Sequence, residues 1–349
     1  MTTEGVPGAG SAAAVAGSAA GSSTAAAGGA LTDPDVLAWV GSAVAAPSLH
    51  NSQPWRFRVL ADDAGIELFA DRRRQLEVID PAGRELLISV GAALFNLRLA
   101  IRHQGRLPQT QMFPDPTQPD LVARVSAAGV DTPSAGIVAL AEAVGRRHTN
   151  RWPFTSAPVP VDLLEALCRA AGHEGAELAV ATAVGRNAIL GLAHSAQQRQ
   201  RDDGAYRAEL AHWTAPRRGR REGVPRTAIG PWDALETLPM RDFGLTTPRL
   251  RRPAERFEPF PTILILSTDG DTQRHWVAAG QALQRVLLLA TVHHLATTPI
   301  SQPLEIPAIR ELLANRLRGS VAQMIVRVGY GPPAVATPRR PLREVLVET

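Results

Sequence analysis

The chain reads AAPSLHNSQPWRF from Ala45 to Phe57, and this stretch decides the fold that we expect. It places two prolines, a histidine, a tryptophan and several small polar side chains between an apolar helical run at 35–46 and an alternating strand near Arg56. Pro47 ends the helix, because proline lacks an amide hydrogen and disfavours helical backbone before it, and Pro54 leads into the strand. The sequence therefore predicts a polar turn, held by two rigid elements, that aims hydrogen-bonding groups at one ligand.

Length and composition indicate a folded protein with a sizeable core. The chain has 349 residues, of which 45% are hydrophobic, enough for two domains or one large unit. All 37 basic residues are arginines and the net charge is only +4, so binding to nucleic acid is the least favoured function. Because Cys168 is the single cysteine, an internal disulfide is excluded. It lies in an apolar helical pattern, which indicates a buried thiol.

No segment reads as a membrane span or a signal peptide. The apolar run 286–292 is too short to cross a bilayer. Residues 1–30 are almost all glycine, alanine, serine and threonine, and they lack the basic and leucine-rich parts of a signal peptide. We expect a disordered tail at 1–30, followed by a soluble, cytoplasmic protein that has no membrane partner.

Hydrophobic periodicity predicts helices and strands in two groups. The first group comprises a helix at 35–46, a hairpin of strands at 55–60 and 66–70, a helix at 84–103 and a strand at 121–127. The second group comprises helices at 136–144, 162–171, 186–200 and 276–295 and strands at 177–183, 262–266 and 322–328. Residues 206–260 are rich in proline, glycine and arginine, and a connection of that length is usually functional or mobile.

A weak internal repeat relates the two groups. The residues GAAL at Gly91–Leu94 recur as GQAL at Gly280–Leu283, and DVL at Asp35–Leu37 recurs as DLL at Asp162–Leu164. Helices that are apolar on most faces indicate a shared central interface. We therefore predict an α+β fold of two related halves around central apolar helices. The predicted halves are 31–135 and 136–349, the second with a possible lid at 206–260.

Two motifs resemble a known family. Ala46–Trp55, APSLHNSQPW, resembles the P-S-x-x-N-x-Q-P-W signature of the FMN-dependent nitroreductases, and Arg146–Arg151, RRHTNR, resembles their R-R-x-[ST]-x-[RK] segment. The order is reversed from ordinary nitroreductases, with about 100 residues between the motifs. Together with Tyr206–Pro216 and Thr337–Pro341, this arrangement is similar to the Acg family of actinobacterial FMN-binding oxidoreductases. The resemblance covers residues 32–345 approximately.

The resemblance implies a nitroreductase-like fold in which one chain takes the place of two subunits. In ordinary nitroreductases two identical subunits interlock, and each flavin takes contacts from both. This chain resembles a fused, degenerate version of that dimer, an intramolecular pseudo-dimer with one complete site whose mate is lost. Such a chain is expected to be a monomer or a homodimer.

Roles at the phosphate end follow from the resemblance and from charge. Arg147 and Thr149 are expected to hold the FMN phosphate and ribityl end, helped by Arg339 or Arg340, because guanidinium groups offer paired donors to phosphate. Arg151 takes the position of a cation beside flavin N1, where negative charge accumulates on reduction. A solvated helix end, a basic tail and a surface ion pair are the alternative interpretations of these arginines.

The remaining candidates surround the flavin ring. Ser48 and Asn51 are expected to bond its edge or the ribityl chain, and Pro47, Leu49 and His50 to line its face or rim. The loop at 295–302 resembles one whose backbone reaches flavin N5, here from Ser301 and Gln302. His50 is either a proton donor or a packing residue. Gln53 and Trp55 are expected to brace the turn.

The expected function is that of an FMN-dependent NAD(P)H oxidoreductase, a nitroreductase that passes hydride from nicotinamide through flavin to a nitroaromatic or quinone-like acceptor. No side chain acts as a covalent catalyst in that reaction. The alternative is a flavin-binding or flavin-sequestering protein without turnover, with 206–260 as its lid. No spacing suits a metal site, no G-x-G-x-x-G motif opens a helix, and the arginines of 217–221 suit a solvated loop.

Overall fold

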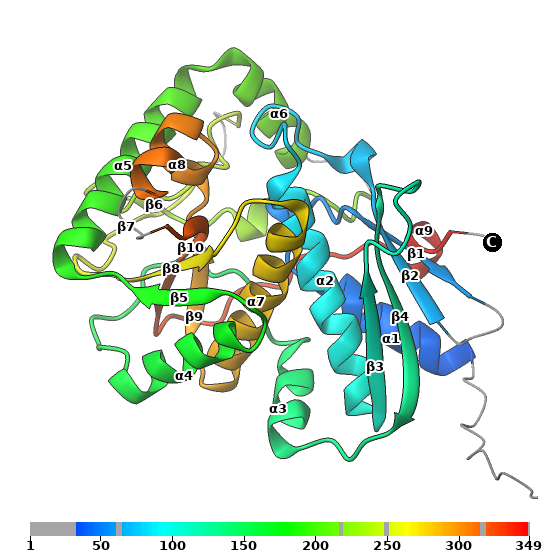
Figure 1. Ribbon diagram of the computed structural model, residues 1–349. Helices are drawn as coiled ribbons and strands as arrows, with labels where there is room; N and C mark the ends of the chain where they lie inside the picture. Colours follow the sequence, from blue (N-terminus) through cyan, green and yellow to red (C-terminus); the bar gives the residue numbers. More distant parts are fainter. Residues whose placement is uncertain (1–32, 61–64, 216–218, 248–250, 315–318, 348–349) are drawn as a thin grey trace, which may run out of the picture. The chain divides into compact units, whose positions relative to one another are not determined.

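The computed structural model describes residues 33–347 except 61–64, 216–218, 248–250 and 315–318. These residues all fall within one compact unit, Leu31–Thr349 (Figure 1). The tail predicted at 1–30 lies outside the described residues, as does the loop of the predicted first hairpin.

The first half is a four-stranded antiparallel sheet with helices packed on it. Its strand order is β1-β2-β4-β3. Its elements are α1 (Asp33–Val44), β1 (Trp55–Val59), β2 (Gly65–Ala70), α2 (Arg84–His103), β3 (Arg106–Met112) and β4 (Leu121–Val130). The short helix α3 (Ala135–Ala143) then leads into the second half.

The second half repeats this plan with a long insertion. Its strand order, β5-β8-β10-β9, matches that of the first sheet position by position. Its elements are α4 (Val161–Gly172), β5 (Glu177–Val180), β8 (Thr262–Thr268), α7 (Gln273–Val292), β9 (Ala296–Pro299), α8 (Pro307–Ala314) and β10 (Val321–Gly329). The prediction of an α+β fold with two related halves is confirmed.

The insertion stands where the first half has its β1–β2 hairpin. It contains α5 (Ala183–Asp202), α6 (Gly204–Thr214) and the two-residue parallel strands β6 (Trp232–Asp233) and β7 (Ala254–Glu255). The region predicted to be irregular at 206–260 thus begins inside a helix. The Asp203 side chain caps α6 by accepting hydrogen bonds from the amides of Ala205 and Tyr206.

Helices α2 and α7 cross at the centre of the repeat (Figure 1). A Cβ atom on Gly91 would lie 3.0 Å from Cα of Gly280 and would collide with the carbonyl oxygen of Val277. A Cβ atom on Gly280 would collide in the same way with the carbonyl oxygen of Ile88. The two glycines of the repeated motif therefore let the helix backbones touch, and the contacts are reciprocal, as a pseudo-two-fold axis requires.

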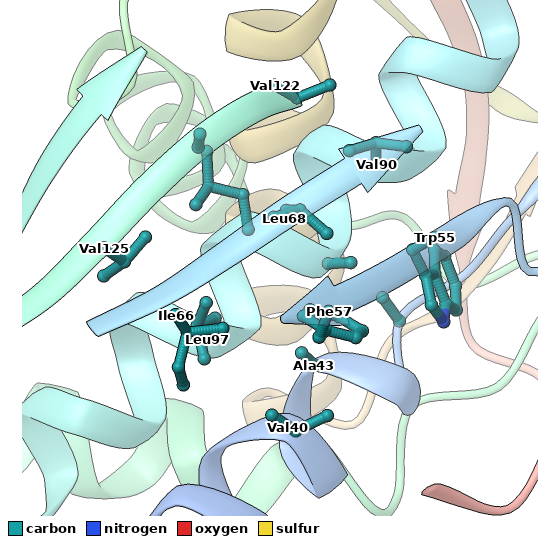
Figure 2. Close-up of a cluster of buried hydrophobic side chains, with 14 of the residues drawn as sticks. Val40, Ala43, Trp55, Phe57, Ile66, Leu68, Val90, Leu97, Val122 and Val125 are labelled. Atoms are coloured by element: carbon teal, nitrogen blue, oxygen red, sulfur yellow. The ribbon is translucent and has the colours of Figure 1, made fainter. Parts of the chain in front are cut away.

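Helix α2 is a core helix. Among the described residues it alone is long and apolar enough to cross a membrane by composition, but 78% of its most apolar window is buried inside the protein. Figure 2 shows how its Val90 and Leu97 meet Leu68 of β2 and Val40 of α1 in one apolar cluster. Trp55 and Phe57 of β1, fully buried, belong to the same cluster, so the strand after the polar turn is anchored firmly.

The end of the chain returns to the first half. Leu346 forms a parallel bridge with Phe57, and the amide of Val347 donates to the carbonyl of Phe57 at 2.8 Å. The short helix α9 (Leu342–Val345) places Val345 in the first-half core. This closing segment, 331–347, carries Arg339 and Arg340 past the turn at 47–53.

Strand β3 was not predicted from the sequence. Its residues, RLPQTQM, are mostly polar and include Pro108, which cannot donate a ladder hydrogen bond. It lies at the edge of the first sheet, where one side is unpaired and both features are tolerated. The other predicted elements are present, with end shifts of a few residues, of which the early end of β5 at Val180 is one.

Candidate functional site

The polar turn adopts an unusual backbone. His50, Asn51 and Gln53 have φ values of 49°, 54° and 53°, in the left-handed region that most side chains avoid. Backbone strain of this kind persists only where surrounding contacts hold it. Gln53 supplies several: its Nε2 donates to the carbonyl of Arg221 at 2.7 Å, and its Oε1 accepts from the amide of Arg340 at 2.8 Å. The bracing role predicted for Gln53 is confirmed.

A pocket opens beside this turn at the junction of the two halves. The space inside it, counted out to its open mouth and including open solvent there, is about 740 Å³. Seven predicted residues line it: Pro47, Ser48, Leu49, His50, Thr149, Arg151 and Ser301. The structure thus brings together the turn of the first half and the arginine motif of the second, as the fused-dimer interpretation requires.

Two arginines stand close together at one end of the turn. Arg147 is 3% exposed, and no carboxylate pairs with it among the residues that the structure describes. Burial and the neighbouring charge of Arg339 lower its pKa to about 9. Burial likewise lowers the pKa of Arg339 to about 10. Arg339 reaches both sides of the turn, donating to the Asn51 side chain at 3.0 Å and to the Ala45 carbonyl at 3.3 Å.

This pair is costly without an anion. Buried charges in proteins are normally paired, and two like charges side by side repel each other. A phosphate group would supply the missing negative charge and accept several donors. The pair therefore fits the phosphate of a nucleotide-like cofactor.

Arg151 lies against the insertion inside the pocket wall. Its Nη1 donates to the carbonyl of Ala228 at 2.8 Å, and its guanidinium stands 4.7 Å above the ring of Phe243. Burial and the nearby Arg241 lower its pKa to about 10. A cation that has no carboxylate partner in the described structure is available to a ligand in the pocket.

His50 is held as a neutral ring. It is buried, its edge packs on Phe243 at 5.1 Å, and neither ring nitrogen has a hydrogen-bond partner among the described residues. Burial, together with Arg241 and Arg151, lowers its pKa well below the ordinary value. This arrangement favours the packing role over that of a proton donor.

The other predicted residues stand behind the pocket wall. Arg340 bonds the Gln53 carbonyl at 3.3 Å and the Glu344 carbonyl, so it secures the turn and lies away from the pocket. Gln302 bonds the Pro239 carbonyl at 3.1 Å. The loop predicted at 295–302 is in fact strand β9 followed by a short 3-10 turn at Gln302–Leu304.

The insertion supplies residues that sequence reasoning did not identify. Met240, Arg241 and Phe243 line the pocket from a segment that has no matching motif. Arg241 is fixed there by an ion pair with Glu305 and by hydrogen bonds to Ser301 Oγ at 3.0 Å and to Tyr206 at 3.2 Å. Only the folded chain brings this segment to the pocket.

Glu85, at the start of α2, also lines the pocket and was not predicted. It is 2% exposed; one oxygen accepts from Arg84 Nη2 at 2.6 Å, and Oε2 has no partner. Burial, reinforced by the charge of Glu305, raises its pKa well above the ordinary value. Glu85 therefore contributes to the wall a carboxyl group whose pKa is raised by burial although it forms an ion pair with Arg84 at 2.6 Å.

The features set aside at the sequence level stay outside the site. No group of metal-ligating side chains occurs among the described residues. Cys168 is a free thiol, half-buried, whose pKa burial raises. Of the arginines at 217–221, those at 217 and 218 lie outside the described residues, and the carbonyl of Arg221 serves to hold Gln53.

Comparisons with known proteins identify the family. The Nitroreductase family model matches residues 144–330. The chain is 35% identical over 313 residues to "Putative NAD(P)H nitroreductase Rv3131" of Mycobacterium tuberculosis, covering 87% of this chain and 88% of that one. It is 33% identical to "Putative NAD(P)H nitroreductase acg" of the same organism, covering 87% and 92%.

Solved structures with some likeness include the FMN-dependent nitroreductase NfnB from Mycobacterium smegmatis in complex with NADPH. That likeness has a TM-score of 0.37 at 20% identity, covering 60% of this chain and 99% of the other. Membership therefore rests on the sequence matches, which confirm the predicted Acg-type relationship and the oxidoreductase class. The chain belongs to the Nitroreductase family, with the Acg protein of Mycobacterium tuberculosis among its relatives.

Proposed function

We propose that the chain is an FMN-dependent NAD(P)H oxidoreductase that reduces a nitroaromatic or quinone-like small molecule. The observation that carries this proposal is the pair of neighbouring charges on the buried Arg147 and the half-buried Arg339, for which the described residues provide no carboxylate partner. Thr149, two residues after Arg147, lines a pocket formed by both halves. Bound FMN would supply the redox chemistry, accepting hydride from a nicotinamide and passing it to the acceptor.

The residues present fit that cofactor. Arg147 and Arg339 would hold the phosphate, with Thr149 on the pocket side. Ser48 offers a hydroxyl group, and Ser301 its backbone, to the ring or ribityl chain. Arg151 offers a positive charge to the ring edge that becomes negative on reduction. Asn51 acts indirectly, because its side chain positions Arg339.

The polypeptide's contribution would be positioning and charge. The left-handed turn at His50 and Asn51 fixes the polar groups of one wall, while Phe243 and Met240 line the same pocket from the insertion.

A flavin titration tests the proposal. Purified protein should be yellow, or turn yellow on addition of FMN, and NADPH or NADH should bleach the flavin spectrum without oxygen. An acceptor such as menadione should restore the colour. Protein that stays colourless and leaves FMN fluorescence unchanged at micromolar concentrations would refute it.

A second candidate function is flavin binding without turnover. It is favoured by the insertion, whose Phe243 packs on His50 and whose Arg241 is tied to Glu305, Ser301 and Tyr206 across the pocket. A segment held this firmly would act as a lid that excludes acceptors. Retained flavin that no nicotinamide reduces, across nitroaromatic, quinone and dye acceptors, would favour this candidate.

We further propose that one chain suffices for one site, because its two halves supply the groups that ordinary family members draw from two subunits. Within the halves proposed at 31–135 and 136–349, the closing segment 331–347 belongs to the second but packs on the first. A monomer is enough for activity, and a homodimer would add no site residue. We expect the cytoplasm, where NAD(P)H is available, and neither nucleic acid nor membrane as a partner.

A further inference from the structure

The pocket wall contains an acid that the expected reaction needs and that the family motifs do not include. Reduction of a quinone by hydride leaves an oxygen that must take up one further proton to complete the hydroquinone. His50 is held neutral and its nitrogens have no partner that could supply protons. Among the described pocket-lining residues the only carboxyl group is that of Glu85.

Glu85 is built into the wall with one oxygen committed and one uncommitted. Oε1 accepts from Arg84, whereas Oε2 is buried without a hydrogen-bond partner. Polar atoms buried in this way are rare, and an unpartnered one in a ligand pocket indicates a contact that the ligand completes. Ser89, on the next turn of α2, lies in the same wall and donates to the Glu85 carbonyl at 2.7 Å.

The charged groups around Glu85 act in opposite directions on the pKa of its carboxyl group. Asp80 caps α2, accepting from the amide of Glu85 at 3.1 Å, and Glu305 faces it from the second half; both negative charges and burial favour the protonated form. Arg84 and Arg241 oppose them, so the carboxylate left after proton release is stabilised in place.

We propose that Glu85 is the proton donor of the pocket. The Glu85 O–H bond breaks and the O–H bond of the reduced acceptor forms; bound FMN would supply the hydride. This role rests on the proposed oxidoreductase function. Glu85 touches the substrate in this scheme and is therefore a catalytic residue.

The first test needs no flavin or turnover. Infrared spectra of the wild-type protein at neutral pH should contain the carbonyl band of a protonated carboxylic acid, which E85Q lacks and E67Q keeps. Glu67 is the matched control, since it is equally buried but forms ion pairs with Arg58 and Arg124. Burial raises the pKa of Glu67, but the two arginines outweigh burial, so the pKa lies below its ordinary value. A wild-type spectrum without that band overturns the proposal.

The second test separates the donor role from the function. The flavin-loaded protein is reduced and mixed with menadione, which needs a proton, or with ferricyanide, which takes one electron and no proton. E85Q should slow menadione reduction about 100-fold to 10,000-fold, the usual contribution of a general acid, and leave ferricyanide reduction unchanged. E85D should restore part of the menadione rate, and E67Q should match the wild type.

The outcomes are distinct. Equal menadione rates in wild type and E85Q overturn the donor role alone, as does an equal loss with both acceptors, which would indicate a structural defect. A wild-type protein that reduces neither acceptor refutes the proposed function, and the donor role falls with it.

Discussion

Arg339 donates a hydrogen bond of 3.0 Å from Nη1 to Oδ1 of Asn51, joining the closing segment of the chain to the turn near its start. The amide nitrogen of the same asparagine donates to the carbonyls of Gly223 at 3.0 Å and Pro338 at 3.2 Å. Asn51 therefore ties together the turn, the insertion and the closing segment. Its side-chain amide contacts Arg339 of the arginine pair, and Asn51 does not itself line the pocket.

Replacing Asn51 by alanine should lower the free energy of unfolding by about 1–3 kcal/mol, because buried carbonyl groups lose their donor. It should also weaken FMN binding by releasing Arg339. The sequence motif alone predicts a loss of binding without loss of stability. Urea unfolding with and without FMN measures both, and N187A, an exposed position on α5, is the neutral control. An unchanged unfolding midpoint in N51A would contradict the bracing role.

Replacing Arg147 by methionine should stabilise the flavin-free protein, because it removes a buried charge that Arg339 repels. FMN binding should weaken about tenfold to a hundredfold, the worth of a charge-assisted hydrogen bond, while riboflavin binding stays the same. Calorimetry with both flavins measures the difference. R146M, at the exposed neighbouring position, should change neither value. Equal losses for FMN and riboflavin would place the phosphate elsewhere.

Replacing Phe243 by alanine should open the pocket, since this ring packs on His50 and under Arg151. FMN should then dissociate faster, and acceptors should be reduced faster if entry limits turnover. F260A is the control, because Phe260 ends the same insertion but is 73% exposed. Stopped-flow flavin release gives the first rate and steady-state assays the second. Identical rates in F243A and the wild type would exclude a lid role for the insertion.

Replacing Gly280 by alanine should destabilise the protein by about 1–3 kcal/mol or more, because the new methyl group would collide with the Ile88 carbonyl at the helix crossing. G41A, within α1 where nothing stands within 4 Å, should instead stabilise by up to about 1 kcal/mol. Thermal unfolding of the two variants decides the matter. Similar stability in G280A and the wild type would show that the halves do not meet backbone to backbone.

Glu85 should make the free energy of unfolding decrease as pH rises above the ordinary pKa of a glutamate side chain. Its folded pKa is raised, so the folded state binds a proton that the unfolded state has already released, and stability decreases with pH across that window. The contribution is complete below the unfolded pKa and is lost above the folded one. E85Q should flatten this slope, as measured by urea unfolding at a series of pH values; an unaltered slope would mean that Glu85 is ionised when folded.

The sequence by itself determined the two-halved architecture and identified two of the segments that form the pocket. Apolar periodicity located α2 at its observed bounds, and the Gly91 and Gly280 motifs revealed the duplication, because a close helix crossing demands glycine locally. The turn at 47–53 and the segment at 147–151 were identified because polar side chains between prolines and paired arginines are chemically conspicuous. The polar edge strand β3 gave no such signal, since an edge needs no hydrophobic alternation.

Only the tertiary structure decided which groups share the pocket. Arg340 matches its motif but turns away to hold Gln53. The Gln302 side chain bonds the Pro239 carbonyl, and the role expected of its backbone stays a prediction. Phe243, Arg241 and Glu85 reach the pocket from an insertion and a helix start that carry no motif. The physical reason is that burial and neighbouring charge set the state of an ionisable group, and both depend on contacts between segments far apart in the chain.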